Sequence, residues 1–172
     1  MMRSILLAAL VLASGGASAR TGADQSFSAK SRALDGDALA VDFRLLGVDA
    51  FERRQLCERR GACWQCGKAA QDFAASLLRS KTARISLTAS TTYGRPVATA
   101  TVDGRDLGES LIRAGLAIPE AQYLRRDPRR GASYATAFSQ AKAAKAGALA
   151  GRWIEPSKWR RGERLQCEGR SR

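Results

Sequence analysis

Hydrophobic and polar residues follow one another along the chain in a pattern that predicts short strands and then helices. Short apolar runs bounded by polar or turn-forming residues predict strands over 34–40, 43–48, 84–89 and 96–102. Apolar residues at helical spacing predict helices over 68–78, 107–114 and 134–146. The order is therefore strands, helix, strands, helix, helix. This order predicts an α+β fold in which a small antiparallel barrel carries helices on its side.

The beginning of the chain is typical of a cleaved export signal. Arg3 supplies a positive start, residues 5–13 form an apolar run, and residues 17–19 form a small-residue cleavage site. The apolar run is too short to cross a bilayer as a helix. We therefore expect an exported chain, periplasmic or secreted, that has three parts. They are a signal peptide over 1–19, a folded domain over 20–155 and a basic C-terminal tail over 156–172.

Four cysteines follow the export signal, namely Cys57, Cys63, Cys66 and Cys167. An even count in an oxidising compartment favours two disulfides, and three pairings are possible. The C-x-x-C sequence formed by Cys63 and Cys66 could instead be a redox pair or half of a zinc site, although a structural bridge is the better interpretation. The polar stretch 53–67, which contains three of the cysteines, predicts a loop.

The chain is strongly basic and contains no histidine. It has 29 Lys and Arg residues against 16 Asp and Glu residues, a net charge of +13, and removal of the leader takes away only Arg3 and leaves +12. Such a domain favours a polyanionic partner: nucleic acid, acidic polysaccharide or an anionic membrane. The absence of histidine excludes Ser-His-Asp and Cys-His hydrolysis and His-ligated zinc. Any hydrolysis must therefore rely on carboxylates, arginines and a metal.

Three charged motifs suggest what the domain does. They are Asp35-Gly36-Asp37, then Phe43-Arg44-Leu45-Leu46-Gly47-Val48-Asp49-Ala50-Phe51-Glu52, then Tyr93-Gly94-Arg95. Carboxylates and arginines together can hold a hard divalent cation and bind a phosphodiester. In order and spacing these motifs resemble the staphylococcal nuclease (thermonuclease) family. The resemblance implies a five-stranded OB-type antiparallel barrel with about three helices.

The resemblance also implies a calcium site. Asp37 and Asp49 correspond to the metal-binding aspartates of the family, and Ala50 would offer its backbone carbonyl. The family's usual ion is Ca²⁺, which suits a site made of oxygen ligands. Only six residues separate Asp37 from Arg44, so we expect the hairpin between them to be cut to a minimal turn near 41–42.

Further residues are implied to act on the phosphodiester itself. Glu52 corresponds to the glutamate that activates or orients the attacking water. Arg44 and Arg95 correspond to the arginines that bind the phosphate and its transition state, a role that suits a planar guanidinium. Tyr93 and Tyr123 correspond to tyrosines that pack near the substrate. The catalytic residues implied by the resemblance are thus Arg44, Glu52 and Arg95.

Two further features are interpreted through the resemblance. Exported relatives often carry a cysteine pair that resembles Cys57 and Cys66, which leaves Cys63 and Cys167 to tie down the tail, so this pairing is preferred. Phe51 stands where the family usually has a proline, so the loop that follows it loses a fixed φ angle.

The aperiodic tail predicts an irregular segment. We expect its arginines, such as Arg160, to add only modestly to binding through charge.

The sequence therefore predicts an exported, Ca²⁺-dependent nuclease, a metal-dependent endonuclease that cleaves DNA or RNA to 3′-phosphorylated products. Its partner would be the nucleic-acid substrate. The sequence implies no stable protein partner and no membrane span, and predicts a monomer. The alternative is a catalytically degenerate OB-barrel module that binds nucleic acid or another polyanion, for example as an accessory protein in exopolysaccharide production. A calcium-dependent cleavage assay distinguishes the two.

Overall fold

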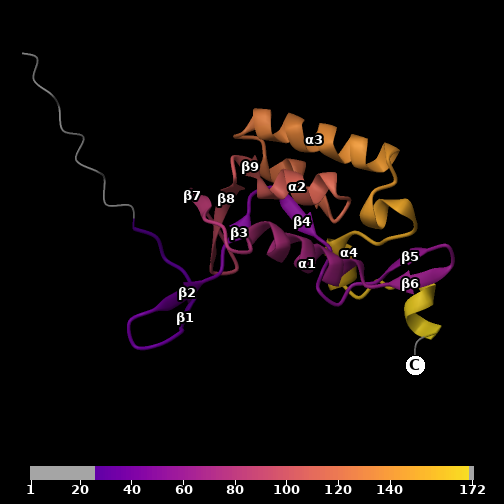
Figure 1. The fold of residues 1–172 in the computed structure, drawn as a ribbon, viewed down its shortest axis with the longest axis horizontal. Coiled ribbons are helices and arrows are strands. Elements are labelled where there is room, and N and C mark those ends of the chain that lie inside the picture. The colour runs from indigo at the N-terminus through magenta and orange to yellow at the C-terminus, as the bar shows by residue number, and fades with distance from the viewer. Residues whose placement is uncertain (1–25, 171–172) are drawn as a thin grey trace, which may run out of the picture.

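The computed structural model describes residues 26–170, so the expected signal peptide lies outside the described residues. The strands are β1 (Ser31–Ala33), β2 (Leu39–Val41), β3 (Arg44–Leu45), β4 (Val48–Ala50), β5 (Cys57–Arg59), β6 (Ala62–Trp64), β7 (Ala83–Thr92), β8 (Arg95–Val102), β9 (Arg105–Asp106) and β10 (Ala117–Pro119). The helices are α1 (Cys66–Leu78), α2 (Leu107–Arg113), α3 (Pro128–Ala143) and α4 (Pro156–Arg160), with 3₁₀ turns η1 (Ala121–Tyr123), η2 (Gly147–Ala150) and η3 (Gln166–Arg170). The predicted α+β class is confirmed (Figure 1).

The largest sheet is built on the long hairpin of β7 and β8. These strands pair antiparallel and are joined by Tyr93 and Gly94, whose φ angles are 50° and 75°. Two successive positive φ angles are typical of the type I′ turn that matches the twist of a hairpin. On the other side of β8, β3 pairs with it in parallel, and Arg44 lies beside Val97. Because Arg95 is two residues before Val97, the register places Arg44 and Arg95 on the same face of the sheet.

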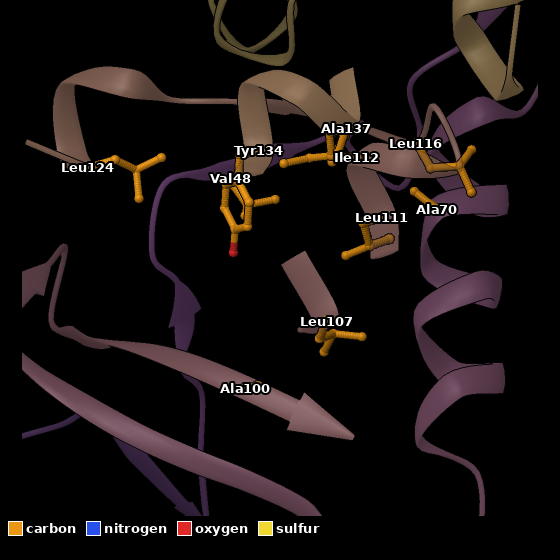
Figure 2. Close-up of a cluster of buried hydrophobic side chains, with 11 residues drawn as sticks. Val48, Ala70, Ala100, Leu107, Leu111, Ile112, Leu116, Leu124, Tyr134 and Ala137 are labelled. Atoms are coloured by element: carbon orange, nitrogen blue, oxygen red, sulfur yellow. The ribbon is translucent and has the colours of Figure 1, made fainter. Parts of the chain in front are cut away.

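The hydrophobic core lies between this sheet and helices α1, α2 and α3. Figure 2 shows its buried side chains, which come from β4, β8 and the three helices and from the segments that contain Leu116 and Leu124. They are Val48, Ala70, Ala100, Leu107, Leu111, Ile112, Leu116, Ala117, Leu124, Tyr134 and Ala137. Burial of each large apolar side chain contributes about 1.5–3 kcal/mol, so this cluster stabilises the packing of the helices on the sheet. β4 also pairs antiparallel with β10, with Asp49 opposite Ile118.

The predicted strand over 43–48 is interrupted, and Gly47 is the reason. Leu46 and Gly47 separate β3 from β4, and the φ angle of Gly47 is 66°. A Cβ at this position would overlap the side chain of Leu124, which packs in the core. Both the positive φ and the close approach therefore require glycine here. The break allows β3 to join β8 while β4 joins β10.

The prediction of a loop over 53–67 is wrong. This stretch contains the hairpin of β5 and β6, and the first turn of α1 begins at Cys66. The hairpin turns at Arg60 and Gly61, which both have positive φ angles. Disulfides and the bridge between Glu58 and Arg152 hold this hairpin in place. It therefore does not need an apolar face, and its sequence is polar and without apolar periodicity. Local pattern alone does not reveal such a hairpin.

The N-terminal hairpin also differs from the sequence prediction. The chain reverses at residues 34–38, where the backbone N–H of Leu34 donates to the carbonyl of Ala38 at 2.8 Å, rather than near 41–42. Asp35 accepts a hydrogen bond from the backbone N–H of Asp37 at 3.3 Å, as turn aspartates do. In Figure 1 the hairpin of β1 and β2 projects away from the helices.

The tail is more ordered than an aperiodic sequence predicts. Pro156 begins α4, and the guanidinium of Arg164 lies 4.1 Å from the ring centre of Trp159. Disulfides join Cys63 to Cys167 and Cys57 to Cys66, which is the pairing preferred from the family resemblance. Disulfides persist in oxidising compartments. Within residues 26–170, no helix has the length and apolar character needed to cross a membrane.

Candidate active site

The site is built around the buried carboxylate of Asp49. Asp49 is the middle residue of β4 and is only 2% exposed. The Arg160 guanidinium donates to it with two prongs, from Nη1 to Oδ1 at 2.9 Å and from Nη2 to Oδ2 at 3.0 Å. Arg44 donates from Nη2 to Oδ1 at 3.3 Å. A buried carboxylate is tolerated only when it is paired in this way, so Asp49 depends on its two arginines.

Glu52 lies next to Asp49 and shares one of its arginines. Nη1 of Arg160 also donates to Oε1 of Glu52 at 2.6 Å, so one guanidinium joins the two carboxylates. The hydrogen bond to Asp49, with a smaller contribution from the bond to Glu52, raises the pKa of Arg160 above the ordinary arginine value. Arg160 is therefore held as a permanent positive charge between two negative ones.

The loop that carries Glu52 is anchored on both sides. Phe51 is buried, and its ring meets that of Trp153 edge-on with ring centres 5.8 Å apart. Gln55 is fully buried; its Oε1 accepts from the backbone N–H of Glu52 at 3.1 Å, and its Nε2 donates to the carbonyl of Ile154 at 2.7 Å. These contacts replace the rigidity that a proline at position 51 would supply. Gln55 cannot be recognised from the sequence as part of the site, because no local pattern marks it.

We expect Gln55→Leu to destabilise the protein by about 1–3 kcal/mol. The substitution leaves the buried N–H of Glu52 and carbonyl of Ile154 without their partner. Urea unfolding followed by far-UV circular dichroism measures the change. Gln65→Leu is the matched control, since Gln65 is exposed and makes no side-chain cap bond. If both variants lost the same stability, the anchoring role of Gln55 would be wrong.

A cavity of about 260 Å³ lies beside Arg44. Its lining includes Thr91, Val97, Glu120 and Tyr123. Tyr123 is 62% exposed, so its ring is accessible to a stacked base. Burial, and then the charge of Asp49, raise the pKa of the Glu120 carboxyl above its ordinary value. The volume is just below the range of about 300–1,000 Å³ that is typical of small-molecule pockets.

The remaining substrate-binding candidates, Arg95 and Tyr93, lie at the start of β8 and in the turn before it. Arg95 is the half-buried first residue of β8, on the same face of the sheet as Arg44. Tyr93 is 88% exposed at the tip of the β7–β8 hairpin. The structure thus brings Arg44, Asp49 and Glu52 together with Tyr123 nearby, and places Arg95 on the adjoining strand.

The expected calcium ligands do not converge in this arrangement. Asp37 lies in the exposed turn of the projecting β1–β2 hairpin, and Ala50 pairs with Ala117 of β10. Both oxygens of Asp49 already accept hydrogen bonds from guanidinium groups. In residues 26–170 no group of three or more His, Cys, Asp or Glu could hold a metal ion. Because Ca²⁺ takes six to eight oxygen ligands, the described contacts do not fit it.

The chain belongs to the staphylococcal nuclease family. The family model described as staphylococcal nuclease homologue matches residues 42–149. This match includes Arg44, Asp49, Glu52 and Arg95, but it begins after Asp37 and ends before Arg160. No curated protein matches the chain. Members of the family are nucleases and are generally Ca²⁺-dependent.

Arg160 is the residue of the candidate site that the sequence did not indicate. We expected it to act as an ordinary tail arginine, whereas it makes three charge-assisted hydrogen bonds in the centre of the site. Its partners are about a hundred residues earlier in the chain, and it lies outside the family match. No motif or local spacing links positions so far apart.

Proposed function

We propose that the protein is an exported nuclease that hydrolyses phosphodiester bonds of DNA or RNA. The observation that carries this proposal is the hydrogen-bonded group of Arg44 on β3, Asp49 on β4 and Glu52 after β4, in which Arg44 donates to Asp49 and Arg160 joins Asp49 to Glu52. Arg44 also lines the cavity that contains Tyr123. Membership of a nuclease family and the basic charge of the chain support it. The two disulfides and the signal-like N-terminus support export.

In the proposed reaction, Arg44 and Arg95 bind the non-bridging oxygens of the phosphate and stabilise the negative charge that develops there. Asp49 orients Arg44 by accepting a hydrogen bond from its Nη2. Glu52 takes a proton from a water molecule whose oxygen attacks phosphorus. The bond from phosphorus to the 5′ oxygen breaks, and that oxygen gains a proton from solvent. The products are a 3′-phosphate and a 5′-hydroxyl.

The Ca²⁺ requirement remains a prediction from the family resemblance. The oxygen ligands of Asp37, Asp49 and the Ala50 carbonyl would suit the ion. In the described residues, however, these three groups do not lie together, and Asp49 is bonded to Arg160. No step of the reaction above is therefore assigned to a metal.

A second candidate function is binding without cleavage. The observation that favours it is the pairing of Arg160 with both Asp49 and Glu52, because it engages the proposed general base in an ion pair. In that case the arginines and the basic surface would hold nucleic acid or another polyanion, and the carboxylates would serve to position arginines.

Cleavage of labelled oligonucleotides tests the proposed function. We expect the mature protein to cut single-stranded DNA and RNA in the presence of Ca²⁺, to leave 3′-phosphate ends, and to stop when a chelator is added. Glu52→Gln protein purified in the same way is the control for contaminating nucleases. Undiminished cleavage in excess chelator would contradict the metal requirement. Tight binding with no cleavage under any condition would favour the binding module.

A further inference from the structure

The position between Asp49 and Glu52 is already taken by a positive charge of the protein itself. We propose that the Arg160 guanidinium is a built-in competitor of divalent cations, so that Arg160 and a metal ion exclude one another at these two carboxylates. The proposal concerns the affinity of the site for cations, and it does not require the protein to be an enzyme.

The hydrogen bonds explain why the two occupants exclude one another. Arg160 binds both oxygens of Asp49 and one oxygen of Glu52 at 2.6–3.0 Å. A bound Ca²⁺ would lie about 2.3–2.6 Å from the same oxygens. Two positive groups cannot share these lone pairs at such distances, and their mutual repulsion would be strong in a partly buried site. A cation can therefore reach Asp49 fully only after Arg160 has withdrawn.

The backbone of the tail is well placed to present this side chain. Before α4, the carbonyl of Ile154 accepts the buried Nε2 of Gln55, and after α4 the chain is fixed by the disulfide between Cys63 and Cys167. α4 itself contacts β4, which carries Asp49. Between these fixed points the Arg160 side chain is 39% exposed. It can thus rotate toward solvent while α4 stays in place, which makes the contact a competition and not a permanent block.

Competition lowers the apparent affinity of the site for a cation. The observed association constant equals the intrinsic constant multiplied by the fraction of molecules in which Arg160 has withdrawn, as for any site whose competent state is partly populated. Removal of the guanidinium should therefore increase Ca²⁺ affinity. Because Arg160 lies beyond the matched residues 42–149, this competition would be a property that the tail adds to the family domain.

Isothermal titration of Ca²⁺ into the full mature chain, after treatment with a chelator, tests the proposal. We expect Arg160→Gln to bind Ca²⁺ at least about 10-fold more tightly than wild type, since the variant loses the competing charge. Arg161→Gln is the matched control, because Arg161 is the exposed next residue and the change in charge is the same. This control should bind like wild type.

Thermal unfolding gives a second readout. At a Ca²⁺ concentration about 100 times the Kd of Arg160→Gln, the Tm of this variant should rise by roughly 5–10 °C.

Two results would overturn the proposal. One is an Arg160→Gln protein that binds Ca²⁺ no more tightly than wild type, or does not bind it. The other is a result with Arg160→Lys. This variant is used if Arg160→Gln does not fold because Asp49 has lost its main partner. Lysine keeps the charge but lacks the two-pronged donor, so we expect an intermediate gain in Ca²⁺ affinity. A lysine variant with wild-type affinity would contradict the competition.

Discussion

Replacement of Glu52 by glutamine should lower the rate of phosphodiester hydrolysis by about 10²-fold or more, the loss expected for a positioned general base. The amide cannot take the proton of the attacking water. It can still accept the hydrogen bond that Arg160 donates to Oε1, so the fold and nucleic-acid binding should be nearly unchanged. Single-turnover cleavage of a labelled oligonucleotide gives the rate, and fluorescence anisotropy gives the binding constant.

Two charge-conserving substitutions complete this test. Arg44→Lys and Arg95→Lys keep the net charge but lose the planar donor, so each should also lower turnover sharply. Arg161→Gln, in the tail, should weaken binding modestly and reduce its salt dependence by about one counterion. If Glu52→Gln and Arg44→Lys cleaved like wild type while tail changes dominated binding, the assignment of the site would be wrong and the binding module would be favoured.

Removal of the disulfide between Cys63 and Cys167 should destabilise the protein by about 3–5 kcal/mol in the chain-entropy model. The two cysteines are 104 positions apart, so the bridge closes a long loop in the unfolded chain. The double variant Cys63→Ser, Cys167→Ser avoids a free thiol. Urea unfolding of this variant and of the oxidised wild type gives the difference in free energy.

A second measurement locates the effect of that disulfide. Without it, the segment after α4 should become sensitive to trypsin at Arg161 and Arg164, since the bridge is its covalent anchor. The wild type should resist cleavage there until it is reduced. A stability loss below about 1 kcal/mol, together with unchanged trypsin sensitivity, would show that noncovalent contacts alone hold the tail.

Local sequence predicted those parts of the fold that depend on neighbouring residues. An Asp-Gly sequence is typical of a tight hairpin turn, and Asp103 and Gly104 both have positive φ angles. A glycine is the usual residue after the end of a helix, and Gly115 follows α2 with a φ angle of 68°. The helix expected over 134–146 begins earlier, at Pro128, because Asp127 caps it through the backbone N–H of Arg130. The polar first turn of that helix has no apolar periodicity, so the pattern underestimated its length.

The sequence by itself determined the class of fold and the family, together with Arg44, Asp49, Glu52 and Arg95 as the candidate residues to examine. These residues belong to motifs whose order and spacing are local properties of the chain.

Only the tertiary structure decided which contacts these residues make. Nothing near Arg160 in the sequence indicates that it meets β4, because a pairing between such distant positions depends on the packing of α4 and on the disulfide that follows it. In the same way, Asp37 stands in a motif expected to converge with Asp49, yet the turn at 34–38 places it on a hairpin that projects from the body of the protein.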